Sequence, residues 1–304
     1  MIENRLAGFF TVTVHNADGT VKEQHEFKNL ITDTGLNSMG SFTGGSNMLR
    51  NCQVGTGSTP PTNGDSALAS FLALQETQWS ADSGYNATDD YHWRRWTYQF
   101  TQGKAAGNLT EIGIGMTGNT QGNLWSRALI TDTSGNPTTL VITANEFLTV
   151  RYELRNYPKH GDTVQTVTID GVERTITIRP MQVKSPGENW ANLMPAINAY
   201  DGGQNANYDG IDLAPGPLGA EDSIPGSPVY LPQSTRVWAA YVPNSFRRVC
   251  NSTVPINMGN GTWPCITFNT GIGKWQMGIN PPLVKNNTQE LKIACAVSWA
   301  RYTP

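Results

Sequence analysis

Carboxylates and a histidine gather in one stretch of the chain, and these residue types could supply acid–base chemistry. Glu76 and Asp82 are followed closely by Asp89, Asp90 and His92. Two carboxyl groups about 5 to 10 Å apart can hydrolyse a glycosidic bond. However, the sequence has no internal repeat of the kind that builds a parallel β-helix, and it has no Gly-x-Ser-x-Gly nucleophile elbow. We therefore predict no catalytic residue and no enzymatic activity.

A second polar cluster has the composition of a calcium-binding loop. Asp201, Asp209 and Asp212 lie among asparagines and glycines, and oxygen ligands on a Gly-containing loop suit Ca²⁺. The segment lacks the EF-hand spacing and its terminal Glu, and any loop dense in turns has a similar composition. We therefore predict no metal site and no cofactor.

The four cysteines show neither a CxxC pair nor a histidine at zinc-ligand spacing. The sequence does not open with a positive segment followed by an apolar one, so we expect synthesis in the cytoplasm, where thiols stay reduced. We therefore expect free buried thiols, with a Cys250–Cys265 disulfide as the alternative.

Aromatic side chains are candidates for binding. The chain has nine Trp and ten Tyr residues, several of them in 79–98. Aromatic rings fill cores, anchor subunit interfaces and stack on sugars, and all three interpretations remain open here. The candidate subunit-contact or receptor-contact residues are Tyr91, Trp93, Asp201, Tyr208, Asp209, Trp263 and Trp275.

Short strands must position these residues. Only 15% of the residues are charged, and 31 Gly with 18 Pro indicate dense turns, which is typical of all-β proteins. Alternation over 6–14, a turn at 16–19 and a second run at 21–27 predict a hairpin, and the Asp170-Gly171 turn predicts another. Further strands are expected within 49–54, 91–102, 109–116, 124–130, 138–143, 147–154, 163–169, 172–178, 235–242, 262–269, 274–279 and 290–301.

One short helix is expected over 35–42. Thr32 or Asp33 would cap its first amides, and Gly44-Gly45 would end it. A second helical turn is possible within 190–197. The fold class that follows is mainly β, with one or two short helices.

Length and local composition divide the chain. The usual domain size predicts about two domains for 304 residues, and Tyr-Pro-Lys-His-Gly at 157–161 stops a long strand. We predict two β-sandwich-like domains, 1–157 and 158–304. The segment 199–232 has no periodicity, so we expect an exposed arm there, centred on Asp201–Pro228, with disorder as the alternative.

Charge and hydropathy exclude two kinds of partner. The net charge is −3 and no Lys/Arg cluster exists, whereas binding to nucleic acid needs a basic face. No run approaches the roughly 18 apolar residues of a membrane helix. We therefore predict neither nucleic-acid binding nor membrane insertion.

A stretch near the N-terminus resembles a module of tailed-bacteriophage virion proteins. Residues 29–36 read N-L-I-T-D-x-G-L, and V-G-T-G-x-T-x-P and then D-x-A-L follow within 54–68. The similarity continues through L-T-E-I-G-I-G at 109–115, L-W-S-R-A-L-I at 124–130 and E-F-L-T-V-R-Y-E-L-R at 146–155. It covers about half of the chain, in a consistent order.

This resemblance implies a non-enzymatic structural protein of the virion, made in the host cytoplasm. Its expected place is the tail tip, baseplate, collar or fibre-attachment region, and its expected partners are copies of itself in a symmetric oligomer and other virion proteins. The alternative is a receptor-binding adhesin or capsid decoration protein that contacts host-surface glycan. An adhesin would expose Trp263 and Trp275, whereas an architectural protein would bury them and use 201–228 as a clasp.

Overall fold

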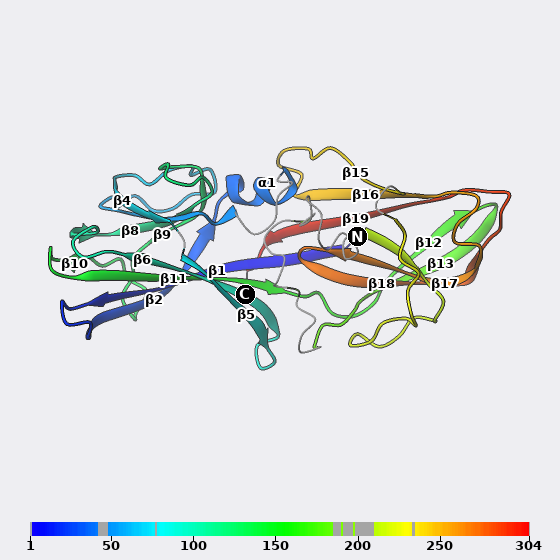
Figure 1. Cartoon of the computed structure of the whole chain (residues 1–304), viewed down its shortest axis with the longest axis horizontal. Coiled ribbons are helices and arrows are strands. Elements are labelled where there is room, and N and C mark those ends of the chain that lie inside the picture. The colour runs from blue at the N-terminus through cyan, green and yellow to red at the C-terminus, as the bar shows by residue number, and fades with distance from the viewer. Residues whose placement is uncertain are drawn as a thin grey trace.

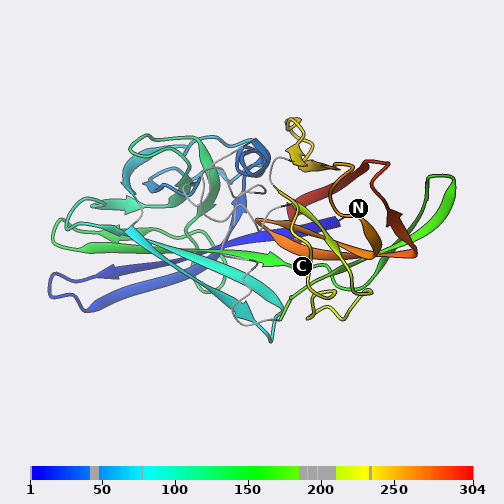
Figure 2. The same ribbon diagram turned by 45° about the vertical axis from the view of Figure 1, so that its right-hand side comes forward.

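The chain folds mainly as β-strands, as expected, and one α-helix occurs among the described residues (Figure 1). The computed structural model describes residues 2–41, 48–76, 78–184, 190, 197, 210–232 and 235–303. Two groups of strands lie end to end along the long axis, and β1 runs from one group into the other (Figures 1 and 2).

The strands of the N-terminal half are β1 (Ile2–His15), β2 (Val21–Ile31), β3 (Asn51–Gly55), β4 (Phe71–Glu76), β5 (Gln78–Asn86), β6 (Tyr91–Phe100), β7 (Gly107–Leu109), β8 (Glu111–Gly115), β9 (Leu124–Leu129), β10 (Leu140–Ile142) and β11 (Phe147–Tyr157). Those of the C-terminal half are β12 (Thr163–Ile169), β13 (Val172–Pro180), β14 (Gly210–Ala214), β15 (Arg236–Trp238), β16 (Arg247–Val254), β17 (Gly261–Thr270), β18 (Gly273–Lys285) and β19 (Leu291–Arg301).

The first hairpin forms as the sequence predicts. β1 pairs antiparallel with β2, and its other edge pairs with β11, which in turn pairs with β6. Phe10, Val12 and Val14 of β1 are buried, while the residues between them are half-buried. This alternation gives the sheet one face toward the core and one face toward solvent.

The two halves of the chain share a sheet. The order β15-β16-β19-β1-β2-β9-β8-β3-β4 runs through both, and β6, β11 and β5 extend it beside β1. Residues 2–6 of β1 pair in parallel with 297–301 of β19. The expected division at 157/158 falls where β11 ends and stays a prediction, but main-chain pairing crosses it.

A second sheet has the order β12-β13-β18-β17-β14. Its β12–β13 hairpin is the one predicted around Asp170-Gly171, and both residues have positive φ, 52° and 73°. Two left-handed residues in a two-residue turn match the right-handed twist of the strands.

The expectation of an exposed excursion over Asp201–Pro228 was wrong for part of its length. Gly210–Ala214 form β14, which pairs with β17, and every residue of this strand is buried. Ile211 and Leu213 contribute to the core, so hydrophobic burial outweighs the turn-like composition. Residues 201–209 of the expected arm lie outside the described residues, as does most of the possible helical turn at 190–197.

The helix α1 (Asp33–Ser41) joins the two halves. Of the two cap candidates, Thr32 has the capping contact, because its Oγ1 accepts a hydrogen bond from the Gly35 amide at 2.9 Å. The indole of Trp299 donates to the Leu36 carbonyl, and Arg248 donates to the Gly40 carbonyl. Side chains of the C-terminal half therefore bond two carbonyls of the helix, and that of Gly40 lies in the last turn, where carbonyls have no partner within the helix.

All four cysteines are buried thiols that form no disulfide, as expected. Burial raises the pKa of the Cys52 thiol well above its usual value. Cys250 lies opposite Cys295 in the β16–β19 ladder, so its cross-strand neighbour is not Cys265. The alternative of a Cys250–Cys265 disulfide was therefore wrong.

Candidate functional site

Glu111, the first residue of β8, is fully buried and hydrogen-bonded on both carboxylate oxygens. Its Oε1 accepts from the Gly57 and Ser70 amides at 3.0 and 2.7 Å. Its Oε2 accepts from the Ala69 amide at 3.0 Å and from Arg127 Nε at 2.9 Å. The carboxylate thus holds the 56–70 connection onto the sheet, and its protein partners occupy both oxygens.

Arg127 of β9 extends this buried network. Its Nη1 lies 2.6 Å from Asp65 Oδ2, and its Nη2 donates to the Thr59 carbonyl at 2.8 Å. Burial alone would raise the pKa of Asp65, but hydrogen bonds from Thr62 and the charge of Arg127 outweigh it and lower that pKa. A buried ion pair is stable only when its remaining polar atoms are satisfied, and the loop provides those partners.

The network unites the stretches that resemble phage virion proteins. Gly57 and Thr59 belong to V-G-T-G-x-T-x-P, and Asp65 belongs to D-x-A-L. Glu111 lies in L-T-E-I-G-I-G, and Arg127 lies in L-W-S-R-A-L-I. The charged residues of these motifs therefore hold the 56–70 connection in its folded position.

The residues predicted as possible acid–base partners do not form one site. Asp90 pairs with His160, whose Nε2 lies 2.5 Å from Asp90 Oδ2, and His160 Nδ1 lies 2.6 Å from Glu221. His92 is instead buried, with Tyr85 and Trp190 as ring neighbours at centroid distances of 4.8 and 5.4 Å. Burial lowers the pKa of His92 to about 4.

His160 joins three segments of the chain. Desolvation would lower its pKa, but the carboxylates of Glu221 and Asp90 outweigh that effect and raise it. Glu221 also accepts a hydrogen bond from the Gly161 amide at 2.8 Å. The imidazole therefore links the turn before β6, the connection after β11 and the loop after β14.

Three of the predicted contact residues are buried inside the chain, which corrects that prediction. Trp263, Trp275 and Tyr91 have exposed fractions of 7, 3 and 6%. Trp263 donates its indole N–H to the Gly259 carbonyl at 2.8 Å, and Trp275 lies against Trp190 and Phe268. These rings fill the core because aromatic side chains bury the most apolar area.

Trp93 is the predicted contact residue that keeps a half-buried position on the outer face of β6. Arg95 lies over its ring at 3.9 Å, and the absence of a side chain at Gly84 leaves room for the indole. Asp201, Tyr208 and Asp209 lie outside the described residues.

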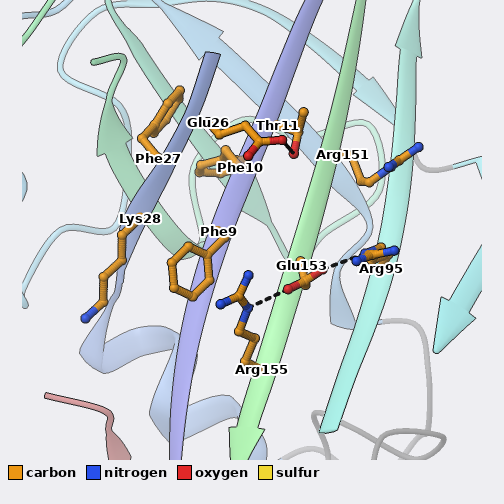
Figure 3. A pocket seen from close by; sticks show the side chains of 10 residues that line it. All are labelled: Phe9, Phe10, Thr11, Glu26, Phe27, Lys28, Arg95, Arg151, Glu153 and Arg155. Atoms are coloured by element: carbon orange, nitrogen blue, oxygen red, sulfur yellow. Dashed lines mark hydrogen bonds and ion pairs between the residues drawn. The ribbon is translucent and has the colours of Figure 1, made fainter. Parts of the chain in front are cut away.

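The candidate site is a groove on the outer face of β2, β1, β11 and β6 (Figure 3). Its volume is about 510 Å³, within the range of sites that bind ligands. Cross-strand register places Lys28, Phe9, Glu153 and Arg95 in one row across the four strands. The groove is lined by Phe9, Phe10, Thr11, Glu26, Phe27, Lys28, Arg95, Arg151, Glu153 and Arg155.

Glu153 organises the centre of this groove. Arg95 Nε and Arg155 Nε each lie 2.5 Å from one of its carboxylate oxygens (Figure 3). The Arg155 guanidinium also lies 3.8 Å from the Phe9 ring centroid and 4.3 Å from that of Tyr91. Charge-assisted bonds and ring stacking together fix both guanidiniums in place.

Sequence reasoning missed this groove because its residues come from four strands far apart in the chain. One signal was present: Arg151, Glu153 and Arg155 alternate along a predicted strand, so they must share a face. Two arginines around one carboxylate on the solvent face would then have indicated a charged surface.

No group of metal-ligating side chains occurs among the described residues, and none of the helices in that part of the chain has the length and apolar composition of a membrane span. No protein-family model, curated protein or solved structure matches the chain.

Proposed function

We propose that this chain is a non-enzymatic structural component of a tailed-phage particle, located at the tail tip, baseplate, collar or fibre-attachment region. The observation that supports this proposal is the buried network around Glu111 and Arg127. The motifs behind the phage resemblance meet there and fix a connection in the sheet. The motif set thus specifies a rigid connection, on which an assembly protein can hold its contact surfaces in place.

Assembly needs exposed strand edges or faces, and the chain offers both. β12 is the last strand of its sheet, and its sequence TVQTVTI has no charge and no proline. Natural edge strands that must stay unpaired usually carry such blocking residues. The groove offers a charged face on the other sheet. The proposed partners are copies of this chain in a symmetric oligomer and neighbouring virion proteins.

A receptor-binding adhesin or decoration protein is the alternative. The positive charges in the groove favour it for host glycans that carry carboxylates. The burial of Trp263 and Trp275 counts against it, because a sugar needs an exposed ring on which to stack.

The two functions differ in their behaviour in solution. Light scattering on the purified protein is expected to give an integer multiple of the chain mass, because the proposed role requires symmetric contacts. A glycan array is expected to show no binding. A stable monomer that binds surface polysaccharide would contradict the structural role and support the adhesin.

A further inference from the structure

The groove carries an excess of positive charge on a chain that is negative overall. Four of its lining side chains, Lys28, Arg95, Arg151 and Arg155, are cationic, whereas Glu26 and Glu153 are anionic. The whole chain has a net charge of −3. A local field opposite to the net charge attracts an anionic partner to this surface rather than to the rest of the molecule.

Two of the four cations have no carboxylate partner in the part of the chain that the structure describes. Arg95 and Arg155 share Glu153. Among the described residues, Arg151 is exposed and forms no ion pair, and the one acceptor for Lys28 is the Tyr302 carbonyl, at 3.3 Å. In the strand register, Arg151 of β11 lies opposite Thr11 of β1. Lys28 of β2 lies opposite Phe9, which is two residues before Thr11 and on the same face of the sheet. The groove therefore presents two cations whose charges are not neutralised.

We propose that this groove binds an acidic segment of another polypeptide chain. A carboxylate of the segment pairs with the guanidinium of Arg151, which suits bidentate bonding, and a second acidic side chain reaches Lys28. β1 carries Phe9 and Thr11 between these two cations, and Glu153, held by Arg95 and Arg155, lies next to Phe9 (Figure 3). That the segment belongs to a neighbouring virion protein rests on the proposed function, whereas the binding of an acidic polypeptide does not.

Two observations favour a polypeptide over an acidic polysaccharide. The ring faces of Phe9 and Trp93 are covered by Arg155 and Arg95, at 3.8 and 3.9 Å, so they are not free to stack on a sugar. The groove also contains the carboxylate of Glu26, which would repel a polymer with a carboxylate on every unit. A polypeptide can alternate acidic with neutral residues, so that it avoids this repulsion, and it needs no free ring on which to stack.

Binding of a fluorescein-labelled peptide of alternating Glu and Ser, followed by anisotropy, tests the proposal. Arg151→Glu is expected to weaken binding by at least about tenfold, because it replaces an attraction with a repulsion. Lys292→Glu makes the same charge change at an exposed position of β19 and is expected to alter the affinity by less than about twofold. Binding to the wild type should also weaken steeply with salt.

Thermal unfolding of both variants checks that they fold. If Arg151→Glu does not fold, Arg151→Gln provides a second test of the same contact. Absence of peptide binding, or equal binding by wild type and Arg151 variants, would overturn the proposal. Binding of polygalacturonate without binding of the peptide would overturn it in favour of a glycan. The proposed function fails separately: peptide binding by a protein that is absent from phage particles leaves the groove assignment intact.

Discussion

Glu111 illustrates how a buried charge depends on its partners. Its carboxylate neutralises Arg127, which is 2% exposed, and it accepts three amide hydrogen bonds from the 56–70 connection. Removing Glu111 would leave these three amides without their acceptor, and among the described residues it would leave Arg127 with Asp65 as its one carboxylate partner. Buried polar groups that lose a partner cost more than the interaction itself contributes.

Replacing Glu111 with Ala should therefore lower the free energy of unfolding by about 3 to 5 kcal/mol. Glu111→Gln, which keeps the side-chain volume, should also destabilise the fold, but by less. Urea unfolding followed by tryptophan fluorescence measures both. Glu290→Gln is the control: this carboxylate is half exposed, and its loss should change the free energy by less than about 0.5 kcal/mol. A Glu111→Gln protein as stable as the wild type would contradict the role given to the network.

His92 predicts a loss of stability in acid. The unfolded chain binds a proton at this residue below pH 6.5, whereas the folded chain, with its pKa lowered to about 4, does not. The free energy of unfolding should therefore fall between these two pH values, by up to about 3 kcal/mol. His92→Phe keeps a ring between Tyr85 and Trp190 and removes the titration. Identical pH profiles for the two proteins, from denaturant titrations, would refute this assignment.

His160 predicts a contribution to stability that changes with pH in the opposite direction. Because its folded pKa is raised above 6.5, its contribution is complete below pH 6.5 and is lost as the pH rises through the folded value. His160→Gln should therefore destabilise the protein more in mild acid than in alkali. Paired unfolding curves of wild type and variant at the two conditions measure this difference, and a larger difference in alkali would show that the carboxylates do not govern this histidine.

At the scale of elements, the sequence predicts the strands in which apolar and polar residues alternate clearly. It does not predict a strand whose inward positions are partly polar. β1 and β2 are visible in the sequence because Phe10, Val12 and Val14 alternate with polar residues. β16 was missed because its inward residues include Arg248 and Ser252. These polar groups face inward because α1 and the residues that flank β15 provide partners such as the Gly40 carbonyl, which no local pattern can reveal.

The helix offers a test of capping at its predicted start. Thr32 Oγ1 accepts from the Gly35 amide at 2.9 Å and donates to the Leu124 carbonyl at 2.6 Å. Thr32→Ala should therefore lower the free energy of unfolding by about 1 to 2 kcal/mol. Thr34→Ala, within the same helix, should be neutral or slightly stabilising because Ala has the higher helix propensity. Equal effects in denaturant titrations would argue against Thr32 as the cap.

At the scale of the whole molecule, the long-range pairing of the two chain ends could not be predicted. The parallel pairing of β1 with β19 joins residues almost a full chain length apart, and neither strand carries a signal for the other. Asn4 and Asn156 both donate to the Ile272 carbonyl at this junction. The groove was missed for the same reason, since it exists only once four strands are in register.

Because β1 belongs to both halves, we expect them to unfold together. Denaturant curves from circular dichroism and from tryptophan fluorescence should coincide in one transition. Two separate transitions would instead favour independent domains divided at 157/158.

The location of the chain in a phage particle tests the central claim most directly. Particles purified from a culture that expresses the chain would be labelled with an antibody against the exposed turn at 16–19 and imaged by electron microscopy. The account predicts label at one defined position on the tail or its attachment region. Particles without label, together with unassembled protein in the lysate, would contradict it.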